Sequence, residues 1–161
     1  MHKAIFLDRD GVLNFEMGEY VTKPENFKVL EFVPAQLKRL TDANFLLIVI
    51  TNQGGIAKGL YTQSDLAVMH KVLTDALLSS GVKLTDIYFC PHHPEFSKCI
   101  CRKPGSLMIE KALAKYHIDP NLSYMIGDKE RDIAAAKAAG VKGLLIEPNE
   151  NWKFLVDEIL K

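Results

Sequence analysis

Short apolar runs rich in β-branched residues alternate along the chain with longer amphipathic stretches. The short runs predict strands at 4–8, 45–51, 86–90, 123–127 and 143–147, and the amphipathic stretches predict helices at 34–43, 64–80, 105–116, 131–139 and 151–160. All five strand candidates are apolar on both faces, as in the buried parallel sheet of a doubly wound, Rossmann-like α/β fold. Thr62 or Ser64 before the second helix, and Gly81 and Gly140 after the second and fourth, are residues that helix ends favour.

The composition is that of a soluble globular chain, with 161 residues of which 48% are hydrophobic and 25% are charged. No repeat, charge block or Gly/Ser linker divides it, so we expect one domain spanning 1–161. Lys plus Arg and Asp plus Glu are both 20, and this zero net charge disfavours nucleic acid and anionic membranes as partners. The apolar stretch before Asp8 is too short for a signal peptide or a spanning helix, so a cytoplasmic protein is expected, and we expect a monomer.

The first predicted strand ends in Asp8-Arg9-Asp10-Gly11. In an open parallel sheet, ligands bind beyond the carboxyl ends of the strands, so the residues found there are candidates for chemistry. Carboxylates at i and i+2 leave an extended strand on the same side, and we expect Arg9 to point away from them. Crowded carboxylates favour a bound cation, although a solvated acidic turn has the same pattern.

Two further predicted strands end in polar residues. Thr51-Asn52-Gln53-Gly54-Gly55 offers a hydroxyl, amides and a close backbone approach, as a phosphate cradle requires. Gly127-Asp128 is followed by Asp132, which an N-terminal position on the next helix would also explain. Each segment alone is compatible with an ordinary polar turn. Three strands that all end this way favour phosphate or metal chemistry.

Four segments in order resemble the haloacid dehalogenase superfamily of aspartate-nucleophile phosphohydrolases: LDRDGV at 7–12, ITNQ at 50–53, RKP at 102–104 and IGDK at 126–129. The resemblance implies that Asp8 is the nucleophile and that Asp10 protonates the leaving alkoxide and then activates water. It also implies that Thr51 and Lys103 hold the phosphoryl oxygens. Asp8, Asp128 and the carbonyl of Asp10 would bind Mg²⁺, which screens the repulsion between a carboxylate and a phosphate.

A cysteine and histidine cluster precedes the third of these segments. Cys90-Pro91-His92-His93 is followed by Cys99-Ile100-Cys101, and these are all the cysteines in the chain. Three thiolates and one imidazole complete a tetrahedral zinc site of the structural type, whereas three cysteines cannot all pair as disulfides. Family resemblance favours His92 over His93 as the fourth ligand.

The cluster and the following Arg102-Lys103 resemble a zinc-containing branch of the superfamily that holds heptose 1,7-bisphosphate 7-phosphatases and histidinol-phosphate phosphatases and that has no large cap domain. This resemblance implies a small phosphorylated metabolite as substrate. The residues expected to bind it are Asn52, Gln53, Gly54, Arg102 and Lys129.

Three features favour heptose bisphosphate as substrate. TNQGGIAKG at 51–59 is similar to TNQSGIARG of the heptose branch, with Gly54 in place of serine, and GEYV at 18–21 resembles its GYV with Glu19 inserted. Asp128-Lys129 matches the metal-binding aspartate and the substrate lysine of that branch. The six residues between His92 and Cys99 are closer to the histidinol-phosphate enzymes, which stay the alternative. A DNA 3′-phosphatase fits the zero net charge poorly, and a non-catalytic zinc-stabilised module leaves the crowded charges unexplained.

Overall fold

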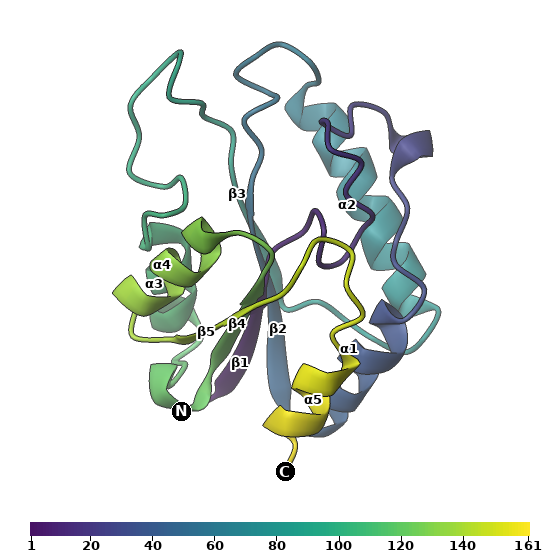
Figure 1. Ribbon diagram of the computed structural model, residues 1–161, viewed down its shortest axis with the longest axis vertical. Helices are drawn as coiled ribbons and strands as arrows, with labels where there is room; N and C mark the ends of the chain where they lie inside the picture. The colour runs from purple at the N-terminus through teal and green to yellow at the C-terminus, as the bar shows by residue number, and fades with distance from the viewer.

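The computed structural model describes residues 1–161. They form one five-stranded sheet and two groups of helices, and the sheet lies between these groups (Figure 1). All strands are parallel, in the spatial order β3-β2-β1-β4-β5. The strands are β1 (Lys3–Leu7), β2 (Phe45–Asn52), β3 (Asp86–Cys90), β4 (Tyr124–Gly127) and β5 (Lys142–Leu145). The predicted doubly wound parallel sheet is therefore confirmed.

The helices lie within one or two residues of their predicted positions. They are α1 (Val33–Asp42), α2 (Gln63–Leu78), α3 (Leu107–Lys115), α4 (Glu130–Ala138) and α5 (Lys153–Ile159), with short 3-10 turns η1 (Pro24–Asn26) and η2 (Pro120–Leu122). Thr62 caps α2 through a capping box with Asp65, and Gly81 and Gly140 follow α2 and α4 with φ of +72° and +75°. None of these helices is long and apolar enough to cross a membrane.

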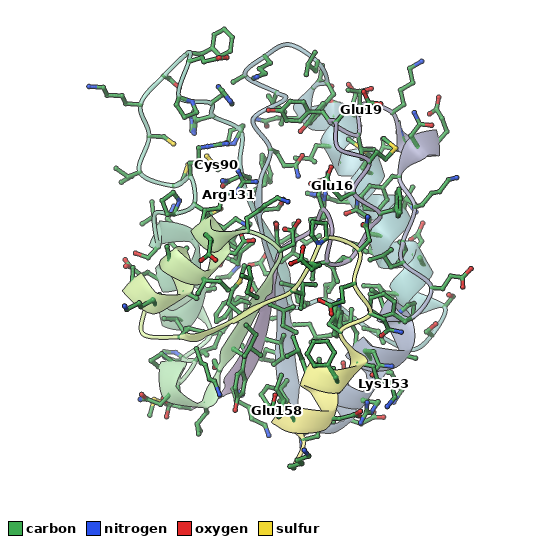
Figure 2. All side chains as sticks on the ribbon, in the orientation of Figure 1. Glu16, Glu19, Cys90, Arg131, Lys153 and Glu158 are labelled. Atoms are coloured by element: carbon green, nitrogen blue, oxygen red, sulfur yellow. The ribbon has the colours of Figure 1, made fainter.

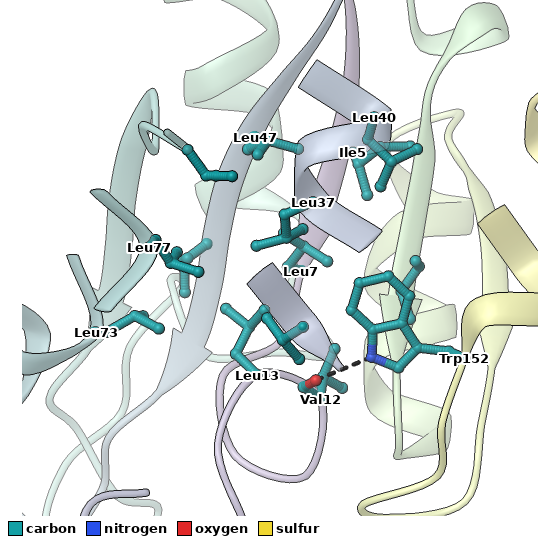
Figure 3. Packing of buried hydrophobic residues seen from close by; sticks show 14 of the residues in the cluster. Ile5, Leu7, Val12, Leu13, Leu37, Leu40, Leu47, Leu73, Leu77 and Trp152 are labelled. Atoms are coloured by element: carbon teal, nitrogen blue, oxygen red, sulfur yellow. Dashed lines mark hydrogen bonds between the residues drawn. The ribbon is translucent and has the colours of Figure 1, made fainter. Parts of the chain in front are cut away.

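Successive side chains of β1 point to opposite faces of the sheet, and each face is covered by helices. Ile5 and Leu7 pack in a hydrophobic cluster with α1, α2 and α5, whereas Ala4 and Phe6 pack in a second cluster with α3 and α4. The outer side of α5 carries charged residues such as Lys153 and Glu158 (Figure 2). Trp152, directly before α5, is fully buried in the first cluster (Figure 3).

The edges of the sheet differ from the prediction. The two edge strands are not buried on both faces: β3 is half-buried over most of its length, and Leu145 of β5 is 49% exposed. No further strand pairs with β3 or β5, so runs that are apolar in sequence stay partly open to solvent.

Three helix ends also differ by two residues each: α2 ends at Leu78 instead of residue 80, and α3 and α5 begin two residues later than predicted. The side chain of Asn151 accepts a hydrogen bond from Lys153 N, and α5 therefore begins after it. Gly105 N bonds to Arg102 O in a turn that delays the start of α3.

The register of the strands brings the polar segments together. β1 ends at Leu7, which pairs with Val49 of β2 and with Ile126 of β4. Asp8, Thr51 and Asp128 therefore lie together at the carboxyl ends of these three strands. The long connections 8–32 and 91–106 contain no helix or strand other than the short η1 and isolated bridges, in agreement with the expected absence of a large cap domain.

Candidate active site

Asp8 is the first residue after β1, and its side chain is held on one side only. Its Oδ1 accepts hydrogen bonds from Lys103 Nζ at 2.9 Å and from Arg9 N at 2.8 Å. No hydrogen bond engages its second oxygen, which is free to act on a ligand. Burial raises the pKa of Asp8 to about 7, although the charge of Lys103 opposes this shift.

Asp10 lies two residues further on and is surrounded by donors. Arg9 Nη2 lies 2.9 and 3.1 Å from its two oxygens, and Asn14 Nδ2 and Gln53 Nε2 donate at 2.9 and 3.1 Å. Burial alone would raise the pKa of Asp10, but the Arg9 guanidinium and these hydrogen bonds hold it below its usual value. The carboxylate is therefore kept ionised and in one orientation.

The expectation that Arg9 points away from the carboxylates is wrong. Arg9 is only 1% exposed, and its guanidinium folds back onto Asp10 while lying 5.1 Å above the ring of Phe27. The chain leaves the extended conformation after Leu7, so alternation along a strand no longer sets the direction of this side chain. Burial, and then the charge of Arg9, lowers the pKa of the neighbouring His70 to about 4, so the imidazole adds no competing positive charge.

The predicted phosphate cradle at the end of β2 lies largely behind the carboxylates. Gln53 is 2% exposed, donates to both Asp10 and Thr51 Oγ1, and accepts a hydrogen bond of 2.5 Å from the hydroxyl of Tyr61. Burial raises the pKa of Tyr61 to about 12, so the phenol stays protonated and fixes the orientation of the Gln53 amide. Sequence analysis did not identify Tyr61, because its contact with Gln53 is set by the turn between them.

Lys103 reaches the site from the loop before α3. Asn52 holds its backbone through a reciprocal pair of hydrogen bonds of 3.1 and 2.9 Å, so this amide positions Lys103. Lys103 is 1% exposed, and its Nζ contacts Ile50 O at 2.7 Å and Asp132 Oδ1 at 2.7 Å in addition to Asp8. Burial would lower the pKa of Lys103, but Asp8 and Asp132 raise it overall, so the ammonium stays charged.

Asp8, Asp128 and Asp132 place carboxylate oxygens within 4.8 Å of one another, and all three residues are buried. Neither oxygen of Asp128 accepts a hydrogen bond, although Lys129 Nζ lies 3.0 Å from one of them. Three crowded carboxylates outnumber the two ammonium groups beside them, Lys103 and Lys129. Such an excess of buried negative charge is costly unless a further cation neutralises it, and oxygen ligands suit Mg²⁺. These residues therefore fit a magnesium ion. Asp132 also bonds to Lys129 N at the start of α4, which is why its sequence position alone suggested a helix cap.

The side chains of Cys90, His92, Cys99 and Cys101 form a second cluster, with all ligand atoms within 4.8 Å of one another. Cys90 Sγ lies 3.7 Å from Cys99 Sγ and 3.0 Å from Cys101 Sγ, and His92 Nδ1 lies 3.3 Å from Cys101 Sγ. Three sulfurs and one nitrogen converging in this way suit a tetrahedral zinc ion. His93 lies outside the cluster and faces Glu95 at 3.5 Å, as expected from the choice of His92.

Asp8, Asp10, Gln53 and Asp128 border one pocket of about 230 Å³. Figure 2 places Glu16 and Glu19 toward α2 and Arg131 toward α4. Thr51 and Lys103 lie behind the wall of the pocket. The walls include eight residues predicted from the sequence, which are Asp8, Asp10, Asn52, Gln53, Gly54, Arg102, Asp128 and Lys129. They also include eight that were not predicted to form the site, which are Arg9, Glu16, Gly18, Glu19, Tyr20, Val21, Tyr61 and Arg131.

Two glycines permit close approaches in this pocket. A Cβ on Gly11, where φ is +81°, would lie 2.6 Å from Asp128 Oδ2. A Cβ on Gly54 would lie 3.1 Å from Arg102 Nη1, so the glycine lets the guanidinium pack closely. The absence of a side chain at this position thus brings Arg102, which also donates to His92 O at 3.1 Å, into the pocket wall.

Comparison with known proteins agrees with this geometry. A family model described as HAD-hydrolase-like matches residues 100–151. The chain is 44% identical over 146 residues to the D-glycero-beta-D-manno-heptose-1,7-bisphosphate 7-phosphatase of Haemophilus ducreyi, covering 87% of this chain and 80% of that protein. The chain belongs to the haloacid dehalogenase family of phosphatases. It is also 40% identical to the D-glycero-alpha-D-manno-heptose-1,7-bisphosphate 7-phosphatase of Photorhabdus laumondii, covering 92% of this chain and 88% of that protein.

Solved structures of the haloacid dehalogenase family share the whole fold. The crystal structure of the D,D-heptose 1,7-bisphosphate phosphatase from B. bronchiseptica, complexed with magnesium and phosphate, superimposes with a TM-score of 0.92 at 30% identity over 98% of both chains. A putative HAD-like phosphatase from Mesorhizobium loti gives a TM-score of 0.87 at 26% identity and covers 99% of this chain and 85% of that one. The predicted family and phosphatase class are thus confirmed.

Proposed function

We propose that this protein removes the 7-phosphate from D-glycero-D-manno-heptose 1,7-bisphosphate in a magnesium-dependent reaction that passes through a phosphorylated Asp8. The observation that carries the proposal is the similarity along nearly the whole chain to phosphatases of this name, eight of which are 36 to 44% identical. The pocket agrees with it, because the predicted nucleophile and substrate-binding side chains border a single opening.

Magnesium would be held by the carboxylates of Asp8, Asp128 and Asp132 and by the carbonyl of Asp10, whose own carboxylate is turned toward Arg9. When bound, the ion neutralises the crowded carboxylates and the charge that develops on the transferring phosphoryl group. Lys103, with its three buried contacts, supplies a second fixed positive charge beside Asp8.

The reaction follows from the two aspartates. The free oxygen of Asp8 attacks phosphorus, the bond between phosphorus and the sugar oxygen breaks, and Asp10, which must enter this step in its protonated form, gives its proton to that oxygen. Asp10 then takes a proton from a water molecule that attacks the same phosphorus, which restores Asp8 and releases phosphate. The donors from Arg9, Asn14 and Gln53 hold Asp10 in the ionised form that the second step requires.

Zinc would be bound by Cys90, His92, Cys99 and Cys101 as a structural ion, because four protein ligands leave no open coordination position. Arg102 and Lys103 follow the last ligand directly, so the ion would fix the part of the loop that enters the site. Thiolate ligands require a reducing compartment, and we therefore propose a cytoplasmic enzyme.

The second phosphate of the substrate would lie at the cationic part of the pocket. Arg102, Lys129 and Arg131 all border it, and neither Arg102 nor Arg131 forms an ion pair within the protein. Arginine suits a phosphate through paired donors and lysine through a point charge. Histidinol phosphate carries one phosphate only and would leave these groups without an anion.

Steady-state kinetics with heptose 1,7-bisphosphate and histidinol phosphate, side by side in Mg²⁺, tests the proposed substrate. We expect kcat/KM for the bisphosphate to exceed that for histidinol phosphate by about 100-fold, since two charge-assisted contacts are lost with the second phosphate. Phosphorus NMR of the product should show that the phosphate at carbon 1 remains. Both anomers of the bisphosphate are used, because the relatives include enzymes named for each. Equal or higher kcat/KM for histidinol phosphate contradicts the proposal.

A further inference from the structure

Asn149 lies in the loop between β5 and α5, far along the chain from the catalytic aspartates but beside them in space. Figure 1 shows this yellow loop next to the purple loop that follows β1. Asn149 N donates to Gly11 O at 2.8 Å, directly after Asp10. Its side chain binds both backbone groups of Glu16: Glu16 N donates to Asn149 Oδ1 at 2.7 Å, and Asn149 Nδ2 donates to Glu16 O at 3.0 Å.

The backbone of Asn149 is held in a conformation that most residues avoid. Its φ is +66°, in the left-handed region, where a residue other than glycine is uncommon and where asparagine is tolerated best. Such a conformation costs free energy and persists because surrounding contacts hold it. Here the contacts are the three hydrogen bonds to Gly11 and Glu16.

The segment that follows Glu16 has no long-range hydrogen bond of its own; its other contacts are Lys58 Nζ at 5.6 Å from the ring centre of Tyr20 and the burial of Val21 in the first hydrophobic cluster. Before it, Phe15 N bonds to Lys28 O, and Asn14 bonds to Asp10. Between Met17 and Tyr20 the one hydrogen bond is local, from Gly18 N to Glu16 Oε1 at 2.9 Å. This turn nevertheless forms part of the pocket wall through Gly18, Glu19 and Tyr20. The pair of side-chain hydrogen bonds from Asn149 to Glu16, here called the clamp, is therefore the last long-range hydrogen bonding before this wall of the pocket.

We infer that Asn149 is a positioning residue for substrate selection: it fixes the turn 16–21 over the pocket, where the turn contacts the part of the substrate away from the transferring phosphoryl group. This inference rests on the proposed function, because it assumes a substrate that extends beyond that group. The turn brings the carboxylates of Glu16 and Glu19 to a pocket whose other wall carries Arg102, Lys129 and Arg131. Carboxylates accept hydrogen bonds from hydroxyl groups and repel a phosphate, so this wall suits the polyol portion of a sugar phosphate.

The test compares Asn149→Gly with the wild type on two substrates. Glycine accepts the positive φ, so the substitution removes the side-chain clamp without adding strain. For heptose 1,7-bisphosphate we expect KM to rise about tenfold with kcat within about twofold, as two hydrogen bonds that position a binding wall are lost. For 4-nitrophenyl phosphate, which has no polyol, both constants should stay within about twofold. An unchanged KM for the bisphosphate, or an equal loss of kcat on both substrates, overturns the inference.

A matched control and a structural readout complete the test. Asn44 has nearly the same backbone conformation, with φ of +63°, but precedes β2 at the opposite end of the sheet, so Asn44→Gly should change neither substrate's kinetics. Amide hydrogen exchange of Glu16 and Gly18 should become faster in Asn149→Gly and stay unchanged in Asn44→Gly. Unchanged exchange overturns the inference whatever the substrate is. If the wild type does not hydrolyse heptose bisphosphate, the proposed function fails, and the exchange result alone decides on the clamp.

Discussion

The pKa values of the two aspartates after β1 depend strongly on the groups around each carboxylate. Asp8 and Asp10 are two residues apart, yet their pKa values shift in opposite directions. Asp8 is dominated by burial, whereas Asp10 has Arg9, Asn14 and Gln53 as donors. Their different surroundings match the different tasks proposed for them, because a nucleophile needs a free oxygen and a base needs a stable orientation.

The raised pKa of Asp8 predicts how metal-free protein responds to pH. The folded pKa of about 7 lies above the unfolded value of 3.8, so the folded protein keeps a proton that the unfolded chain has already released. The stabilisation that this proton provides is complete below about pH 4 and is lost as the pH rises through 7. In EDTA, the stability of Asp8→Asn relative to wild type should therefore increase between pH 4 and 7, by about 1 kcal/mol or more.

Urea denaturation at several pH values measures this difference. Excess Mg²⁺ serves as the control, since the ion would stabilise the wild type through Asp8 and should raise its midpoint more than that of Asp8→Asn. Stability curves of the two proteins that run parallel from pH 4 to 7 in EDTA would show that Asp8 does not titrate as described.

Among the connections between elements, the loop that follows β3 carries three of the four residues of the Cys/His cluster but contains no helix or strand. We predict that Cys99→Ser lowers the zinc content, the melting temperature and kcat together, because the loss of one ligand frees the loop that leads to Arg102 and Lys103. Metal analysis by mass spectrometry, thermal denaturation and kinetics measure the three effects. Lys98→Ala, an exposed neighbour in the same loop, should leave all three unchanged. An unchanged zinc content in Cys99→Ser would remove Cys99 from the cluster.

The elements themselves could be predicted well from the sequence. Apolar runs and helix-ending residues give the five strands and five helices, since these signals are local. The direction of Arg9 and the burial of the edge strands could not be predicted, because each depends on what packs nearby. For the same reason the motifs identified Asp8 and Asp128, whereas the pocket walls formed by Glu16 and Arg131 and the support from Asn149 arise from contacts between distant segments.

At the scale of the whole molecule, Trp152 connects the C-terminal helix to the loop that follows β1. It is fully buried, packs edge-on against Phe32 at 5.5 Å, and donates from Nε1 to Val12 O at 2.9 Å (Figure 3). We predict that Trp152→Phe lowers the free energy of unfolding by about 1 to 3 kcal/mol, through a smaller ring and an unsatisfied carbonyl on Val12. Urea denaturation measures this loss. Phe154→Ala, which truncates a half-exposed ring nearby, is the control and should change stability by about 0.5 kcal/mol or less. Equal stabilities of Trp152→Phe and wild type would contradict this account.

The central claim is that Asp8 carries the phosphoryl group during turnover, and trapping that group tests it most directly. In Asp10→Asn, attack on 4-nitrophenyl phosphate needs no acid because nitrophenolate is a good leaving group, whereas the later attack by water lacks its base. Rapid mixing should therefore release about one nitrophenolate per chain in a burst, and mass spectrometry of the acid-quenched protein should find one phosphoryl group on Asp8. The double variant Asp8→Asn/Asp10→Asn should show neither. A missing burst, or a phosphoryl group on any other residue, would contradict the mechanism.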